Sequence, residues 1–203
     1  MTLANPFARA LIPTLVFAAA VPASAAESAD MARLKAHLGA VRTMTANFTQ
    51  TDARGRSAAG TLQLKRPGKV RFAYGSGDLL LVANGKTLTF IDYQVGQKSS
   101  WPLNRTPLGV LLSDSPNLKG RAQVIPTGDS RVVSVRARDP AQYGSINLVF
   151  LRNGSAPGGL QLYGWTAIDA QNKRTTIKLA NQRYNVAVPE SAFRFEEPKK
   201  RRG

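Results

Sequence analysis

The chain has 203 residues, with 28 Lys and Arg against 12 Asp and Glu, one His and no Cys. The lack of cysteine excludes disulfides and thiolate metal sites, so a chain of this length needs a hydrophobic core for its stability. One histidine and few carboxylates leave no residue set for a nucleophilic triad or a zinc site. A pair of carboxylates could still serve a glycosidase, but Asp92, Asp114, Asp129 and Asp139 all stand beside turn residues, where Asp is common for structural reasons. We therefore expect a protein that is not an enzyme and that has no catalytic residues, metal or cofactor.

The first 26 residues have the pattern of a secretion signal. Arg9 precedes an apolar stretch at residues 11–21, and small residues follow at 22–26. Pro13 interrupts the apolar stretch, which is shorter than the roughly 20 residues of a membrane-spanning helix, so an N-terminal anchor is the weaker interpretation. We expect cleavage after Ala25 or Ala26, and therefore an exported protein. Because no cysteine follows the cleavage site, the mature product should carry no attached lipid.

The excess of positive charge survives this cleavage. Residues 27–203 hold 27 Lys and Arg against 12 Asp and Glu, and residues 199–202 read Lys-Lys-Arg-Arg. Such a charge usually indicates nucleic acid, but export removes the protein from it. Two interpretations stay open: attraction to an anionic membrane surface, or charges that keep an apolar binder soluble.

One helix is predicted near the start of the mature chain. Its apolar residues recur with helical spacing: Met31, Leu34, Leu38 and Val41. Ser28 or Asp30 could cap its first turn. His37 lies beside the apolar stripe, and we expect it at the surface or at the boundary of the core rather than as a ligand or base.

After Thr43 the pattern changes to short alternating segments. Eleven strands are predicted, at residues 45–52, 59–66, 69–74, 79–83, 87–92, 95–101, 121–125, 131–138, 145–152, 159–168 and 173–184. Pro67-Gly68 and Asn84-Gly85 are turn signals; the latter is typical of a type I′ hairpin with two positive φ angles. Residues 107–112 form a short apolar segment within a break. The spacing indicates an all-antiparallel sheet that curls into a sandwich or barrel.

Each predicted strand has one apolar and one polar face, because successive side chains point to opposite sides of a sheet. The apolar faces comprise Leu62 and Leu64, then Val70, Phe72 and Tyr74, then Leu88 and Phe90, then Ile146, Leu148 and Phe150, and finally Leu160 and Leu162. An ordinary packed core explains this alternation as well as a ligand cavity does. One long helix and one short apolar segment are little material to cover so wide a sheet, and an under-filled apolar sheet would bind apolar ligands.

Several segments carry a resemblance to a known family. They are Phe-Thr-Gln at 48–50, GTLQLKRPGKVRF at 60–72, LVANGKTL at 81–88, Thr-Pro-Leu at 106–108 and FRFEEP at 193–198. In this order and spacing the chain resembles the LolA-type outer-membrane lipoprotein carriers of Gram-negative bacteria.

The resemblance implies an incomplete antiparallel β-barrel of about eleven strands, with an N-terminal helix and a short helical lid over a hydrophobic cavity. It implies a periplasmic monomer that takes acylated lipoproteins from an inner-membrane ABC transporter and passes them to an outer-membrane receptor. Arg66 would be the lid latch, which hydrogen-bonds main-chain carbonyls of the lid. Leu108, Leu111 and Leu112 would belong to the lid. The acyl-cavity lining would comprise Phe48, Leu62, Leu64, Val70, Phe72, Tyr74, Leu88, Phe90, Ile146, Leu148, Phe150, Leu160 and Leu162.

The expected organisation is therefore a signal peptide at 1–26, a carrier half-barrel domain at 27–198 and a basic tail at 199–203. Alternatives to lipoprotein transport are a carrier or sensor of another anionic lipid, or a non-transport adaptor whose barrel is filled. Nucleic acid is not an expected partner.

Overall fold

In the computed structural model, the described residues are 23–106, 108–113, 118, 122–138, 144–169 and 171–199, with the backbone alone for 23–28, 110 and 138. The elements are α1 (Ala23–Ala40), β1 (Thr43–Thr51), β2 (Ser57–Lys65), β3 (Lys69–Tyr74), β4 (Leu79–Asn84), β5 (Thr87–Asp92), β6 (Gln97–Pro102), η1 (Leu103–Arg105), α2 (Gly109–Leu112), β7 (Ala122–Ile125), β8 (Val132–Arg138), β9 (Ser145–Arg152), η2 (Pro157–Gly159), β10 (Leu160–Ile168), β11 (Arg174–Tyr184) and η3 (Glu190–Phe193). The segment at 1–22, which holds most of the predicted signal peptide, lies outside the described residues. The predicted cleavage positions, Ala25 and Ala26, lie in the first turns of α1. Among the described residues, no helix has both the length and the apolar character needed to cross a membrane.

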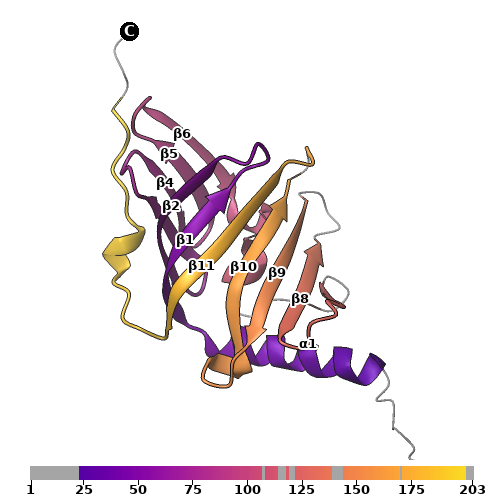
Figure 1. Cartoon of the computed structure of the whole chain (residues 1–203). Helices are drawn as coiled ribbons and strands as arrows, with labels where there is room; N and C mark the ends of the chain where they lie inside the picture. The colour runs from indigo at the N-terminus through magenta and orange to yellow at the C-terminus, as the bar shows by residue number, and fades with distance from the viewer. Residues whose placement is uncertain are drawn as a thin grey trace, which may run out of the picture.

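The eleven strands form one antiparallel sheet in the order β6-β5-β4-β3-β2-β1-β11-β10-β9-β8-β7. All pairings but one join strands that are consecutive in the chain, and the β1–β11 pairing joins the two halves. Because β6 and β7 are the two edges and do not pair with each other, the sheet curls without closing (Figure 1). The prediction of an incomplete, eleven-stranded antiparallel barrel is confirmed.

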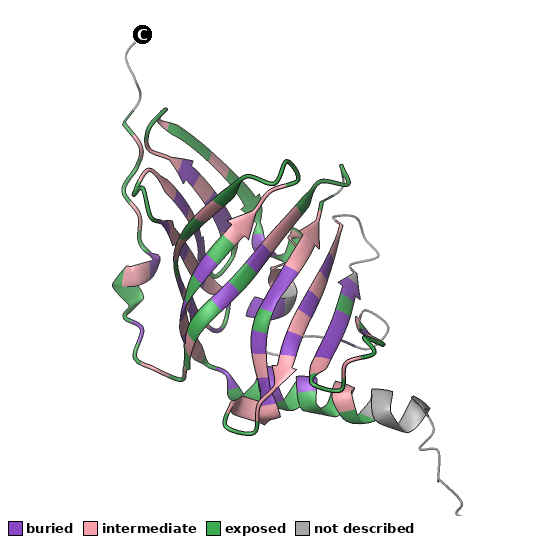
Figure 2. Cartoon of the chain, in the orientation of Figure 1, coloured by how far each residue is buried: buried purple, intermediate pink, exposed green. Residues whose placement is uncertain are grey.

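The alternation of side chains divides the sheet into a concave and a convex face. Along β3, Val70, Phe72 and Tyr74 are buried on the concave side, whereas the residues between them are half-buried. Figure 2 shows the same alternation of buried and exposed positions along the neighbouring strands. The concave faces of both halves merge into one large hydrophobic core.

Two predicted details of local structure are wrong. The β4–β5 hairpin exists, but Asn84 is the last residue of β4 and pairs with Lys69, and only Gly85 has a positive φ, of 114°. The turn is therefore not of type I′, because a longer β4 takes the first turn residue into the ladder. Ser28 and Asp30 do not cap α1, because the helix begins several residues earlier.

The C-terminal segment after β11 crosses the convex face, where it covers a second hydrophobic cluster. Leu80, Val82 and Ile91 point outward from β4 and β5 and are buried against Val188 and Phe193. In Figure 1 this segment, with η3, runs along the outside of the β1–β6 half. We call residues 185–199 the C-terminal strap.

Candidate functional site

A small apolar cavity lies between the concave face and α2. It is lined by Met44, Leu62, Leu64, Val70, Phe72, Leu108, Leu111, Leu112, Leu162 and Trp165. The sheet residues come from strands β1, β2, β3 and β10, so the cavity spans the junction of the two halves. The three leucines of the α2 segment close it on the side away from the sheet.

Aromatic rings form the wall of the core beside this cavity. Phe48 meets Phe72 edge to face with their ring centroids 5.2 Å apart, and it meets Tyr74 in the same way at 5.1 Å. Trp165 packs against Phe72 at 6.1 Å. Burial raises the pKa of the Tyr74 phenol, whose hydroxyl donates to Gln50 Oε1 at 2.8 Å. Such edge-to-face pairs keep apolar walls in a defined shape.

The cavity is almost closed in this conformation. The space that admits the centre of a water-sized sphere measures ≈ 10 Å³, whereas a cavity that holds a benzene ring measures about 150 Å³. At this position the protein's own side chains fill nearly all of the space. For the concave face as a whole, an under-filled sheet stays a prediction. α2 and its leucines occupy the space, so an apolar chain could enter only if they moved.

The turn between β2 and β3 holds the covering elements in place. Arg66, which is buried, donates from Nη1 to the main-chain carbonyl of Leu38 in α1. The N–H of Gly68 donates to the carbonyl of Leu112 in α2 at 2.8 Å. The carbonyl of Gly68 accepts from the N–H of Gly85 at 3.0 Å. One short turn thus contacts α1, α2 and the β4–β5 turn.

α1 is further fixed by His37, which the sequence interpretation placed wrongly. The ring is buried and lies edge-on to Phe150 and Tyr184, at centroid distances of 5.2 and 5.7 Å. Its Nδ1 lies 2.8 Å from the carbonyl of Pro157, which can only accept, so Nδ1 carries the hydrogen. Burial lowers the pKa of His37, and the nearby Arg66 charge acts in the same direction. A single histidine beside an apolar stripe gave no sign that η2 would cover it.

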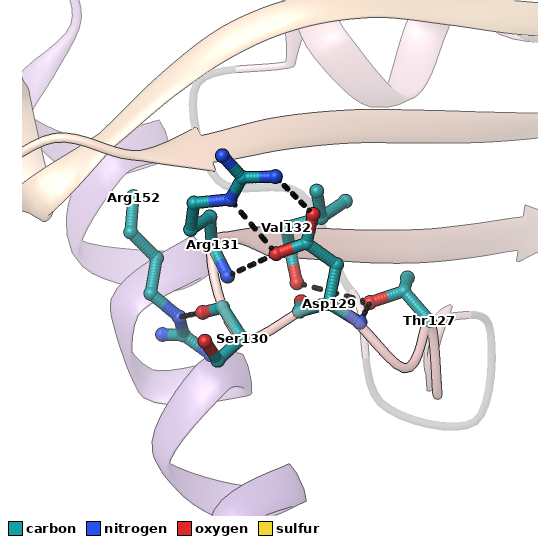
Figure 3. A network of polar contacts seen from close by, with 6 residues as sticks. All are labelled: Thr127, Asp129, Ser130, Arg131, Val132 and Arg152. Atoms are coloured by element: carbon teal, nitrogen blue, oxygen red, sulfur yellow. Dashed lines mark hydrogen bonds and ion pairs between the residues drawn. The ribbon is translucent and has the colours of Figure 1, made fainter.

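A polar network ties the N-terminal half of α1 to the β7–β8 loop. Arg152 forms an ion pair with Asp30 of α1 at 2.6 Å, and its Nε donates to the carbonyl of Ser130 at 2.8 Å. In the same loop Arg131 binds Asp129 at 2.8 Å, and this hydrogen-bonded pair lowers the pKa of Asp129 to about 2 (Figure 3). Asp129, one of the weighed hydrolytic carboxylates, therefore shapes a loop.

The C-terminal strap holds the same β2–β3 turn from the convex side. Glu190 pairs with Lys65 at 2.7 Å and with Lys69 at 2.5 Å, the residues that flank the turn. These hydrogen bonds lower the pKa of Glu190 to about 2. Arg71 also binds the strap, because its Nη1 donates to the carbonyls of Ala192 and Arg194. The turn that contacts α1 and α2 is thus braced from both faces of the sheet.

A wider, open hollow lies on the outer side of α2. Its volume is ≈ 520 Å³, and it is lined by Pro67, Gly68, Gly85, Lys86, Leu103, Asn104, Gly109, Leu112 and Ser113. Leu112 borders both this hollow and the inner cavity.

A sequence model described as "Outer membrane lipoprotein carrier protein LolA" matches residues 39–196. The chain belongs to this family. It is 28% identical to the outer-membrane lipoprotein carrier protein of Chromobacterium violaceum over 202 residues, which cover 93% of this chain and 95% of the relative. It is also 28% identical to the corresponding protein of Pseudomonas fluorescens, over 94% and 95% of the two chains. Among solved structures, the MucA/MucB complex of Pseudomonas aeruginosa gives a TM-score of 0.47 at 13% identity, over 83% of this chain and 61% of that chain.

Within this LolA-family fold, the residues predicted as acyl-cavity lining occupy two kinds of position. Leu62, Leu64, Val70, Phe72 and Leu162 line the inner cavity together with the predicted lid residues Leu108, Leu111 and Leu112. Phe48, Tyr74, Leu88, Ile146, Leu148, Phe150 and Leu160 are buried in the surrounding core. Phe90 is only half-buried, near the edge of the sheet.

Met44 and Trp165 line the cavity but were missed by the sequence interpretation. β1 begins two residues earlier than predicted, which brings Met44 into the sheet. In β10 a bulge between Leu162 and Gly164 shifts the alternation, so that Trp165, and not Gly164, faces the core. A bulge of this kind leaves no mark in a period-two pattern.

Proposed function

We propose that this protein carries lipoproteins, and that it shields their acyl chains between the concave face and α2. The observation that carries the proposal is the closed apolar cavity, whose covering helices are held by hydrogen bonds from one turn to their main-chain carbonyls. An acyl chain of about 15 methylenes costs roughly 12 kcal/mol to expose to water. A carrier must therefore bury such chains, yet release them without an energy source of its own.

Membership of the LolA family supports this function, as do the curated relatives, which are named outer-membrane lipoprotein carrier proteins. Binding, and not catalysis, is the activity that those names describe. Three finer points belong to the proposal: export to the periplasm through residues 1–26, receipt of cargo from an inner-membrane ABC transporter, and delivery to an outer-membrane receptor. In the same proposal Arg66 is the latch that holds α1 over the sheet.

The lid must move for cargo to enter. The inner cavity has room for no more than about one water molecule, whereas the outer hollow beside Leu112 is open. We place the entry route at Leu112, because among the described residues this side chain is the one that lines both spaces. The acyl chains would displace the leucines of α2 and take their contacts with Leu62 and Val70.

The test measures how a fluorescent triacylated lipopeptide binds to the purified full chain. Val70→Glu places a charge in the cavity wall and should abolish binding, whereas Ala73→Glu, on the convex side of the same strand, should leave it intact. Leu108→Glu serves as a second variant that is less demanding for folding, because Leu108 is half-buried. If both cavity variants fold and bind the lipopeptide as the parent chain does, the assignment of the cavity is wrong.

A transfer assay tests the finer points. Inner-membrane vesicles that contain the transporter should release a lipoprotein when this protein is added, and native mass spectrometry should show that lipoprotein bound. Release without any bound acylated molecule would contradict a carrier role.

A further inference from the structure

The convex face of the sheet is strongly one-sided in charge. Among the described residues, no Asp or Glu occupies an outward position on any of the eleven strands. Among the residues whose side chains the structure describes, the outward basic residues are Lys65, Lys69, Arg71, Lys98, Arg136, Arg174, Lys178 and Arg183. These residues occur in both halves of the sheet, but their partners lie in one half only.

The C-terminal strap supplies partners for the basic residues of one half. Glu190 pairs with Lys65 and Lys69, and Glu197 pairs with Lys98 of β6 at 2.6 Å. Arg71 is covered by the main chain of the strap. Each outward basic residue in the β2–β6 half of the convex face therefore has a partner in the strap.

The other half is left uncovered and basic. Arg136, Arg174, Lys178 and Arg183 are exposed, and within the described part of the chain none of them has an ion-pair or hydrogen-bond partner. We call these four residues the outer basic face.

The ladder places three of them around a polar centre. Arg136 is paired with Asn147, which is paired with Thr166 and then Thr176, so these residues form one rung across β8 to β11. Arg174 and Lys178 flank Thr176 on the same face of β11. With strand spacings of about 4.8 Å and rises of about 3.3 Å per residue, the cations surround a field roughly 14 by 13 Å across. Between them stand hydroxyl and amide groups, such as the Thr166–Thr176 pair at 3.1 Å.

We propose that the outer basic face docks the protein onto an anionic phospholipid bilayer. Basic side chains with nearby hydroxyl and amide groups are suited to phosphate headgroups. Protein interfaces instead have an apolar, aromatic centre from which lysine is depleted. In the described part of the chain, the centre of the outer basic face is formed by the polar residues Asn147, Thr166 and Thr176. The bulge of β10 exposes Tyr163 beside Gly164, the residue that pairs with Lys178, and tyrosine is enriched at membrane surfaces.

This docking leaves the binding site accessible. The outer basic face is convex, whereas α2 and both hollows lie on or beside the concave side. Docking would therefore hold the protein at a membrane surface while α2 stays free to move. The inference does not depend on the identity of the cargo, so it can fail while the carrier function stands.

The experiment uses flotation of the full chain with vesicles of phosphatidylcholine, alone or mixed with an equal amount of phosphatidylglycerol. We expect salt-sensitive binding to the mixed vesicles only. Each basic residue near an anionic surface should change the affinity about fivefold, so the triple variant Arg136→Gln, Arg174→Gln and Lys178→Gln should bind about 100-fold more weakly.

A control variant with the same net charge carries Arg33→Gln, Lys35→Gln and Lys86→Gln, which replace exposed residues on α1 and in the β4–β5 turn. It should keep most of the binding, and both variants should melt as the parent chain does. Equal loss in the two variants would show a general charge effect and overturn the proposal. The proposal would also be overturned if removal of residues 199–203 alone abolished vesicle binding, or if the parent chain did not bind the mixed vesicles.

Discussion

Replacement of Arg66 by leucine should release α1 without unfolding the sheet. Arg66 is buried at the end of β2, and its guanidinium donates to the carbonyl of Leu38 near the C-terminal end of α1. Leucine removes this bond while keeping an apolar side chain in the buried position. The carbonyl at the helix end then loses a charged donor, so α1 should separate from the sheet more often.

The expected size of the effect follows from the kind of bond. A hydrogen bond to a charged group contributes about 1.5–3 kcal/mol, which corresponds to a roughly ten- to hundredfold change in an equilibrium constant. Removal of a buried charge also relieves its desolvation cost. We therefore expect about a tenfold rise in the opening of α1, with a small change in the free energy of unfolding of the whole protein.

Hydrogen exchange of the α1 amides measures the opening, and the rate of lipopeptide loading measures its consequence. Arg71→Leu is the matched control, because Arg71 also donates to main-chain carbonyls, at 3.1 and 3.3 Å, but on the convex face. Exchange and loading should rise only in Arg66→Leu. If Arg66→Leu changes neither more than Arg71→Leu does, Arg66 is not a latch.

Three further predictions concern the supports of this arrangement. Gly158 has a φ of 65°, and an added Cβ would lie 2.7 Å from His37 Cα. Gly158→Ala should therefore lower the free energy of unfolding by more than the roughly 1–2 kcal/mol that the left-handed conformation costs a residue with a side chain. Burial lowers the pKa of His37 below its ordinary 6.5, so the unfolded chain takes up this proton before the folded protein does. Stability should therefore fall as the pH drops below about 6.5 and through the lowered pKa. His37→Gln should remove this part of the pH dependence of the melting temperature. Because the pKa of Glu190 is lowered from 4.5 to about 2, its contribution should be present above pH 4.5 and lost as the pH falls towards 2; Glu190→Gln should speed proteolysis of the strap at neutral pH.

Each of these has a comparison within the chain. Gly159→Ala shares the positive φ, of 72°, but its Cβ would meet no atom within 4 Å, so equal destabilisation would refute close packing at Gly158. An unchanged melt profile in His37→Gln would place the acid sensitivity elsewhere. For the strap, Glu196→Gln is the comparison, since no ion pair of that side chain occurs among the described residues; similar proteolysis of both variants would contradict the bracing role of Glu190.

The alternation of apolar residues predicted the concave core well, because it follows from strand geometry alone. Val70, Phe72 and Tyr74 lie where the pattern places them. The same rule places Leu80, Val82 and Ile91 on the outer face of β4 and β5 and predicts no partner for them there. In the structure they are buried, because the C-terminal strap covers that face. The Phe-Arg-Phe run near the C-terminus was visible, but nothing local shows that it crosses the outside of a sheet more than 100 residues earlier in the chain.

By itself, the sequence determined the strand content, the apolar concave face and the excess of basic charge, because these depend on local spacing and composition. The leucines predicted for the lid rested on the family resemblance. Only the tertiary structure decided which basic residues find a partner, that Arg66 meets α1, that His37 is buried and that Trp165 faces the cavity. Each of these depends on contacts between distant segments or on a bulge that shifts register. A one-dimensional pattern carries no information on where such segments meet.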